Sequence, residues 1–304
     1  MIVTYGVRVA VLAGALLMMS GCAGDGTEFL PPEVDAVEVG TPTFDGSLEP
    51  NAAVLALVPD DVDTVTVTDY EQVRLQMGLP DLTTADKRAD RDAFWARAEA
   101  ERPLLSTGML RPIEPKLKRE YGLSQLDVAW EAHLFDELGN EVGFVLAFRD
   151  GTDMAAVGRA VDAGFVALEG ATVDADHGLV TSGTTDDGDA SWAADASVRP
   201  LVGLPSNATY VARGCVDQPV SGNVDDLEVY SVQFEGTLAT ARLGESRTDL
   251  FDRMRLSDQV PEFDQAYDGG VADPGTGRIG YVMTDPAAAA SLAMAGKLPF
   301  AACL

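Results

Sequence analysis

Residues 64–78 of the 304-residue chain read Thr-Val-Thr-Val-Thr-Asp-Tyr-Glu-Gln-Val-Arg-Leu-Gln-Met-Gly. The alternating Thr and Val residues over 64–68 predict a short β-strand, because β-branched side chains suit a pleated surface. Asp69 is a favoured N-cap for a helix over 70–77, and Gly78 can take the left-handed conformation that ends a helix. This stretch predicts a strand followed directly by a helix, and therefore a protein that mixes helices and sheets.

The same order of strand, Asp, helix and Gly occurs twice more along the sequence. The second copy spans 143–164, with Asp153 as the expected N-cap. The third spans 279–296, with Asp285 as the expected N-cap and Pro286 at the first helical position, where proline is favoured. The first and third copies share Thr-Asp before the helix and Leu-Pro after the glycine, which suggests an internal duplication.

Other segments also have the pattern of regular structure. Turn-forming residues at 137–140 lie between two strand-like segments and predict a β-hairpin, and those at 177–178 predict a second one. In a helix expected at 84–102, the alanines fall on one face with charged residues around the rest. The expected strands are 127–135, 141–148, 172–176, 179–182, 210–216 and 228–234, and a further helix is expected at 245–260.

A polar loop at 184–190 is the best boundary between two halves of the chain. The first half, 51–184, has the order of a ferredoxin-like split βαβ unit. The second half, 185–304, has a similar content, with strands near 210, 228, 279 and 300 and helices near 250 and 290. We predict an α+β fold in which two ferredoxin-like units pack together. A single larger α+β domain is the alternative.

The N-terminal residues 1–21 have the pattern of an export signal. Arg8 is followed by an unbroken apolar run over 9–19, which is too short to span a bilayer as a stable helix. Two small residues then precede Cys22, so that a signal peptidase can reach the bond and the thiol can carry a diacylglycerol. We expect an extracytoplasmic protein that is lipid-anchored to the cell membrane through Cys22. A buried cysteine after an ordinary signal peptide is the alternative.

The chain is strongly acidic, with 49 Asp and Glu against 21 Lys and Arg and a formal net charge of −28. Its hydrophobic content of 46% is ordinary for a globular protein, which argues against a disordered acidic tail. Charge of this sign repels nucleic acid and anionic lipid headgroups, so we expect no nucleic-acid partner. Residues 22–50 are rich in Gly, Pro and acids without any periodicity, which predicts a flexible acidic tether.

Three cysteines occur in the chain. If Cys22 carries lipid, Cys215 and Cys303 remain, and an even pair in an exported protein predicts a disulfide. Closing a loop of this length contributes about 4–5 kcal/mol in the chain-entropy model. The bond would also hold the C-terminal end, which would otherwise fray. Two free buried thiols are the alternative.

The sequence offers few residues suited to catalysis. His133 lies in a strand on the same face as Glu131, where we expect a solvated position, and His177 is expected in a turn. With two histidines and no thiolate expected to be free, a zinc site of the usual type lacks ligands. The Gly-x-Gly-x-x-Gly string at 275–280 precedes a strand rather than a helix, so we interpret it as a turn. No hydrolase nucleophile motif is present, and we predict no catalytic residue and no cofactor.

Acidic clusters are the remaining candidates for metal binding. Calcium takes six to eight oxygen ligands, and alternating Asp residues in a loop can supply several of them. The best candidates are Asp186, Asp187 and Asp189. No cluster completes the Asp-x-Asp-x-Asp-Gly pattern with a distal Glu, and a chain with 49 acids forms such clusters by composition alone.

The whole chain resembles uncharacterised actinobacterial envelope lipoproteins. The resemblance rests on the lipobox at Cys22, the acidic tether, the strings Leu57-Val-Pro-Asp60 and Thr66-Val-Thr-Asp69, and the late cysteine pair. It implies location rather than activity. We therefore expect a non-catalytic, membrane-anchored binding or scaffold protein of the cell envelope, whose partner is an unknown envelope protein or ligand. The alternatives are a secreted carboxylate-dependent hydrolase and an acidic calcium-binding module.

Overall fold

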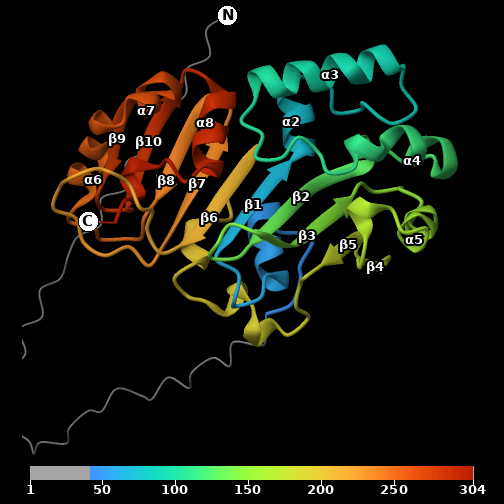
Figure 1. The fold of residues 1–304 in the computed structure, drawn as a ribbon, viewed down its shortest axis with the longest axis horizontal. Helices are drawn as coiled ribbons and strands as arrows, with labels where there is room; N and C mark the ends of the chain where they lie inside the picture. Colours follow the sequence, from blue (N-terminus) through green and yellow to red (C-terminus); the bar gives the residue numbers. More distant parts are fainter. Residues whose placement is uncertain (1–41, 304) are drawn as a thin grey trace, which may run out of the picture. The chain divides into compact units, whose positions relative to one another are not determined.

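A ten-stranded sheet with antiparallel neighbours runs through residues 42–303, the part of the chain that this computed structural model describes (Figure 1). The strand order across the sheet is β4-β5-β3-β2-β1-β6-β7-β8-β10-β9. The expected export signal, Cys22 and most of the expected tether lie outside the described residues. The strands are β1 (Thr64–Asp69), β2 (Val128–Phe135), β3 (Glu141–Phe148), β4 (Thr172–Asp174), β5 (Leu179–Ser182), β6 (Ala208–Arg213), β7 (Val229–Glu235), β8 (Leu238–Arg242), β9 (Tyr267–Asp273) and β10 (Arg278–Met283).

Each half of the chain contributes five neighbouring strands, and both sets have the same order from the centre of the sheet to its edge. β1 pairs with β6 at the centre, where Val65 lies opposite Val211. Outward from this pair, each half places its second, third, fifth and fourth strands in turn. In this structural repeat, β1 corresponds to β6, because each is the first strand of its half. The Thr-Asp and Leu-Pro strings instead accompany β1 and β10. The sequence similarity and the structural repeat therefore do not match the same strands.

The mixed α+β class is confirmed, but the arrangement as two ferredoxin-like units is not. In a split βαβ unit the strands on either side of a helix are parallel, and another strand separates them. Here β1 and β2 are antiparallel neighbours, with Val65 opposite Leu134. The long connection over 70–127 contains three helices and returns the chain alongside the strand that it left.

Two groups of helices cover the same face of the sheet (Figure 1). Phe144, His133, Thr66 and Tyr210 lie opposite one another across four strands, so their side chains share that face. Phe144 belongs to the core beneath α2–α5, and Tyr210 to the core beneath α6–α8. The helices are α1 (Pro50–Ala53), α2 (Tyr70–Gln76), α3 (Arg88–Glu101), α4 (Glu114–Tyr121), α5 (Met154–Asp162), α6 (Leu250–Leu256), α7 (Pro261–Ala266) and α8 (Pro286–Met294).

A third core lies on the opposite face of the sheet, over its central strands. Val65 and Val145 contribute to it from the sheet, and Val54 and the fully buried Trp192 cover them. Phe44 packs against this core although it falls within the stretch expected to be tether. The last residues of that stretch therefore contact the folded part of the chain.

The three predicted helix starts are confirmed in atomic detail. The carboxylates of Asp69, Asp153 and Asp285 each accept a hydrogen bond from a backbone amide three residues later, at 2.9–3.1 Å. The three glycines after these helices all have a positive φ between 62° and 72°. Local sequence signals therefore set both ends of α2, α5 and α8.

Several other predicted elements differ from the structure. The helix expected at 84–102 is shorter, and its alanine face is exposed, whereas Phe94, Trp95 and Ala98 are buried. The helix expected at 245–260 is reduced to α6, and the strand expected near 300 is a 3₁₀ turn with one bridge to Val216. Aromatic burial decides the inward face of α3, because Phe and Trp side chains remove more apolar area from water than Ala does. The elements that were not predicted are α1, α4, α7, β8 and β9.

The predicted disulfide between Cys215 and Cys303 is present, and their Cα atoms are 5.1 Å apart. It joins the segment after β6 to the C-terminal end of the chain. The amide of Cys303 also donates to the carbonyl of Val216, at 2.9 Å. Covalent and backbone hydrogen bonds therefore hold the same two segments together.

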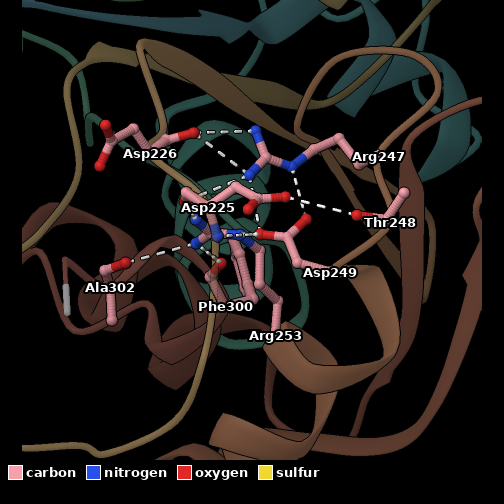
Figure 2. Close-up of polar contacts among 8 residues, drawn as sticks. All are labelled: Asp225, Asp226, Arg247, Thr248, Asp249, Arg253, Phe300 and Ala302. Atoms are coloured by element: carbon pink, nitrogen blue, oxygen red, sulfur yellow. Dashed lines mark hydrogen bonds and ion pairs between the residues drawn. The ribbon is translucent and has the colours of Figure 1, made fainter.

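A buried ion network strengthens this junction (Figure 2). Asp249 lies 2.7 Å from both Arg247 and Arg253. Burial raises the pKa of the Asp249 carboxyl, but hydrogen bonds from the two guanidinium groups outweigh it and lower the pKa to about 2. Arg253 is fully buried and also donates to the backbone carbonyls of Asp225, Phe300 and Ala302. We call the disulfide and this network the C-terminal clamp.

Substitution Arg253→Met should destabilise the protein strongly. It leaves the buried carbonyls of Phe300 and Ala302 and part of a buried carboxylate without their donor, a loss that typically costs about 3–5 kcal/mol. The matched control is Arg255→Met on the same helix, because Arg255 is 68% exposed and its ion pair with Asp252 lies on the surface. We expect the control to change stability by less than about 0.5 kcal/mol. Urea denaturation of the full-length protein measures both, and equal midpoints would contradict a structural role for Arg253.

Candidate functional site

A buried carboxylate lies near the centre of the sheet, on the helix-covered face. Glu131 of β2 is fully buried and accepts hydrogen bonds from the Ser106 hydroxyl and, at 2.9 Å, from the Gln125 side chain. His133 lies two residues further along the strand, with its Nε2 3.3 Å from Glu131. Its Nδ1 lies 3.0 Å from Glu141 of β3. Both ring nitrogens of this histidine therefore face carboxylates.

The predicted face of His133 is confirmed, but its predicted solvation is wrong, because only 12% of the side chain is exposed. Burial alone lowers the pKa of His133, while hydrogen bonds and charges from Glu131 and Glu141 outweigh it and raise the pKa to about 9. A serine triad places a neutral histidine between nucleophile and acid. Here Glu131 stands between Ser106 and His133, and the histidine is protonated at neutral pH. The cluster is therefore built as a structural ion pair rather than as a nucleophile and its base.

Protonation of His133 should make stability depend on pH. The folded chain holds this proton up to about pH 9, whereas an unfolded chain releases it near pH 6.5. The contribution is complete below pH 6.5 and is lost as pH rises to about 9, by roughly 3 kcal/mol. His133→Gln should remove most of this slope, and the exposed His177→Gln should keep it. Denaturant titrations at several pH values measure the effect, and an unchanged slope in His133→Gln would disprove the assignment.

Two other sequence candidates are surface turns, as predicted. His177 lies in the turn between β4 and β5, with its Nδ1 2.6 Å from Asp174. The glycine-rich string at 275–280 begins in the turn after β9 and runs into β10, so a strand follows the turn and not a helix. Because a dinucleotide site needs a helix N-terminus after the glycines, this string does not bind phosphate in that way.

The geometry gives the calcium hypothesis no support. Asp187 accepts a hydrogen bond from the amide of Asp189, at 3.1 Å, and so begins a short 3₁₀ turn. Between residues 42 and 303, no group of three or more His, Cys, Asp or Glu side chains is placed to hold a metal ion. Asp186, Asp187 and Asp189 are therefore not gathered into a coordination sphere.

An open groove of about 630 Å³ lies between α3 and α4. The two segments that form its walls run antiparallel. Arg91, in the first half of α3, pairs with Glu114 at the start of α4. Arg111, which comes before Glu114 in the chain, pairs with Glu99 near the end of α3. The charged residues of the groove are Arg88, Arg91, Arg111, Lys118 and Arg119 on the positive side and Asp92, Glu99 and Glu114 on the negative side. We call it the α3–α4 groove; cations outnumber acids in its lining.

Ion pairs connect the two walls of the α3–α4 groove. Arg91 donates to Glu114 at 2.6 Å, and both side chains are largely buried. The guanidinium of Arg111 lies 4.6 Å above the ring of Trp95, where a cation–π attraction adds to its ion pair with Glu99. These contacts fix the spacing of the walls, and the charges that form them balance one another.

The cations at the N-terminal end of α3 are held by weaker contacts than Arg91 and Arg111. Arg88 is 85% exposed and, within the described part of the chain, pairs only with Asp92 on its own helix, at 3.3 Å. Arg119 is 68% exposed and pairs with the adjacent Glu120. Lys118 donates to the backbone carbonyl of Thr84 rather than to a carboxylate. Exposed ion pairs are worth little, so these three cations can exchange their partners for an incoming anion.

A sequence signal for this groove exists but was not used. Nine of the 21 Lys and Arg residues lie between Lys87 and Arg119, with only five acids among them. The stretch is locally positive in a chain whose net charge is −28. Its interpretation as a groove needed α4, which the sequence did not predict, because this short helix has no side-chain N-cap to mark its start.

A second pocket, of about 680 Å³, lies at one end of β1, β2 and β3. It contains Trp130, the aliphatic side chains of Leu48 and Leu75, and the carboxyl of Asp69. Burial raises the pKa of Asp69 to about 6, although the amide of Gln72 opposes the shift. We call it the Asp69 pocket. Glu71, at its rim, is about half exposed, so the two acids do not form a pair of buried carboxylates.

The raised pKa of Asp69 predicts a second pH effect. The folded chain binds a proton between about pH 4 and pH 6 that the unfolded chain releases, so stability should fall by roughly 2–3 kcal/mol as pH rises through that window. Asp69→Asn should remove this slope while it keeps the helix cap, because Asn also accepts from the Gln72 amide. Thermal unfolding between pH 4 and pH 7 measures it. A slope that persists in the variant would show that another group is responsible.

No protein-family model matches the chain, and no curated protein or solved structure is significantly similar to it. Within the described residues, no helix is long and apolar enough to cross a membrane.

Proposed function

We propose that this protein is a non-catalytic, lipid-anchored binding protein of the cell envelope, and that the α3–α4 groove is its recognition site. The anchor follows from the lipobox at Cys22 and the export signal before it. The observation that carries the site is the excess of cations in one open groove of a strongly acidic chain. Charge of opposite sign to the rest of the surface attracts an anionic partner to one place.

The arrangement of ionisable groups favours binding over hydrolysis. His133 is held between two carboxylates, and Glu71, which lines the same pocket as Asp69, is about half exposed. A carboxylate-dependent hydrolase needs a pair of acids placed on either side of the scissile bond. The groove, in contrast, offers several arginines, whose planar guanidinium groups bind carboxylate and phosphate oxygens in two-pronged fashion.

The test uses the full-length lipoprotein, made with its own signal in a bacterial host that processes lipoproteins. The groove variant is Arg88→Gln/Arg119→Gln, and the control is Arg97→Gln/Arg255→Gln, which removes the same charge from exposed positions outside the groove. Cys22→Ala tests the anchor.

We expect wild type and control to retain the same envelope component, with retention falling as salt rises. The groove variant should lose it, and Cys22→Ala should leave the membrane fraction. Retention that is identical in the groove variant and wild type would disprove the site. A Cys22→Ala protein that stays in the membrane fraction would disprove the anchor.

A further inference from the structure

We propose that the Asp69 pocket binds a small organic ammonium ion that carries an apolar group. This inference goes beyond the proposed function, because the pocket lies at one end of β1, β2 and β3 and shares no residue with the α3–α4 groove. Three properties of the pocket support it: a wall of side chains from the sheet, apolar side chains that are exposed to solvent, and carboxylates that outnumber the cations beside them.

One wall of the pocket is a row of side chains that crosses four strands. Trp130 of β2 lies between Asp69 of β1 and Ala147 of β3, its partners on either side. Ala147 in turn lies opposite Leu179 of β5. Side chains at opposite positions of neighbouring strands share one face of a sheet, and all four of these residues line the pocket. A carboxylate therefore stands at one end of an otherwise apolar row.

Apolar side chains from two other segments also line the pocket. Phe44 and Leu48 precede α1, and the ring of Phe44 lies 5.5 Å from that of His177, which closes the pocket on that side. Leu48 is 51% exposed, and Leu75 of α2 is 59% exposed. A volume of about 680 Å³ is within the range of small-molecule sites, which are concave and mostly apolar. The pocket can therefore cover the apolar part of a small ligand.

The charged residues of the pocket favour a cation. Its acids are Glu49, Asp69, Glu71 and Asp150. Arg149, the arginine in the lining, pairs with Glu71 at 3.3 Å and donates to two backbone carbonyls. In the part of the chain that is described, the ion pairs of the pocket involve Glu71 and leave the other three acids without a cationic partner.

The cations around the pocket do not cancel this negative charge. Arg74 is fully buried outside the lining and pairs with Glu71, at 3.8 Å, so it shares that acid with Arg149. His177 is in the lining, but it pairs with Asp174 of β4, at 2.6 Å. A surplus of carboxylates therefore remains on the side of Asp69.

The spacing of the acids indicates an organic cation rather than a metal ion. Between residues 42 and 303, no three His, Cys, Asp or Glu side chains are placed to hold a metal. Burial and the charges of Glu71 and Glu49 raise the pKa of Asp69, because each of them disfavours its ionised form. An ammonium group beside Asp69 would remove this repulsion, and its apolar part would contact Trp130, whose ring also attracts cations.

The experiment is isothermal titration calorimetry of the full-length lipoprotein in detergent, at constant ionic strength and pH 7.5. The probes are phenethylamine, 2-phenylethanol and phenylacetate, which present the same ring with a positive, a neutral and a negative group. Asp69→Asn removes the charge and keeps the helix cap, and its control is Asp153→Asn, the same change at the cap of α5 outside the pocket. Leu75→Ser removes an exposed apolar side chain from the pocket, and its control is Leu138→Ser, which is exposed elsewhere.

We expect one site for phenethylamine, about tenfold tighter than for 2-phenylethanol, and no binding of phenylacetate. Asp69→Asn should weaken phenethylamine by about five- to tenfold and Leu75→Ser by about two- to fivefold, while each control changes it by less than about twofold. No binding of phenethylamine by wild type, equal binding of either other probe, or equal weakening by the controls would overturn the inference.

The groove variant Arg88→Gln/Arg119→Gln separates this inference from the proposed function. It should bind phenethylamine like wild type, because the α3–α4 groove and the Asp69 pocket share no residue. A groove variant that loses phenethylamine would place the ligand outside the Asp69 pocket and overturn the inference. Envelope capture by the groove is measured independently, so either result leaves the proposed function to its own test.

Discussion

The pairing of β1 with β6 is the constraint on which the rest of the structure depends. Without it each half would present a bare central strand, and such edges expose unpaired amides and carbonyls that favour aggregation. With Val65 opposite Val211, the two five-stranded sets form one continuous sheet. The same pairing lets both helix groups cover one face and lets the third core form on the other.

The central strands also explain why the buried Glu131 has a structural role. Thr66 and His133 lie between Phe144 of one helix-covered core and Tyr210 of the other, where polar side chains replace apolar ones. Burying a charge is costly unless it is paired and hydrogen-bonded. Glu131 meets that condition through Ser106, Gln125 and His133, so the cluster is satisfied from within the protein. A group so fully paired has little capacity left for a substrate.

In the α3–α4 groove, by contrast, several charged side chains are not fully paired within the protein. Its inner ion pairs fix the walls, but its outer cations are exposed and weakly paired. The acidic surface elsewhere repels anions, and in such a field a positive groove both attracts an anionic ligand and limits where it can bind. Because exposed charges are screened by salt, recognition at this place depends on ionic strength more than the buried pairs do.

The sequence by itself determined the features that depend on neighbouring residues. It predicted the caps at Asp69, Asp153 and Asp285, the two hairpins of the first half, and the Cys215–Cys303 pair, because each needs only a few side chains or a simple count. It also placed nine basic residues in one short stretch, although that signal was not used.

Only the tertiary structure decided the order of the strands, the buried face of α3 and the place of His133. Each of these depends on contacts between segments far apart in the chain. The antiparallel return over 70–127 cannot be deduced from the order of elements alone, since the same order also fits a split βαβ unit. The aromatic side chains Phe94 and Trp95 face inward because a partner surface exists to bury them, and that surface also forms the groove. The sequence specifies the side chains, whereas the contacts between distant segments form only when the chain folds.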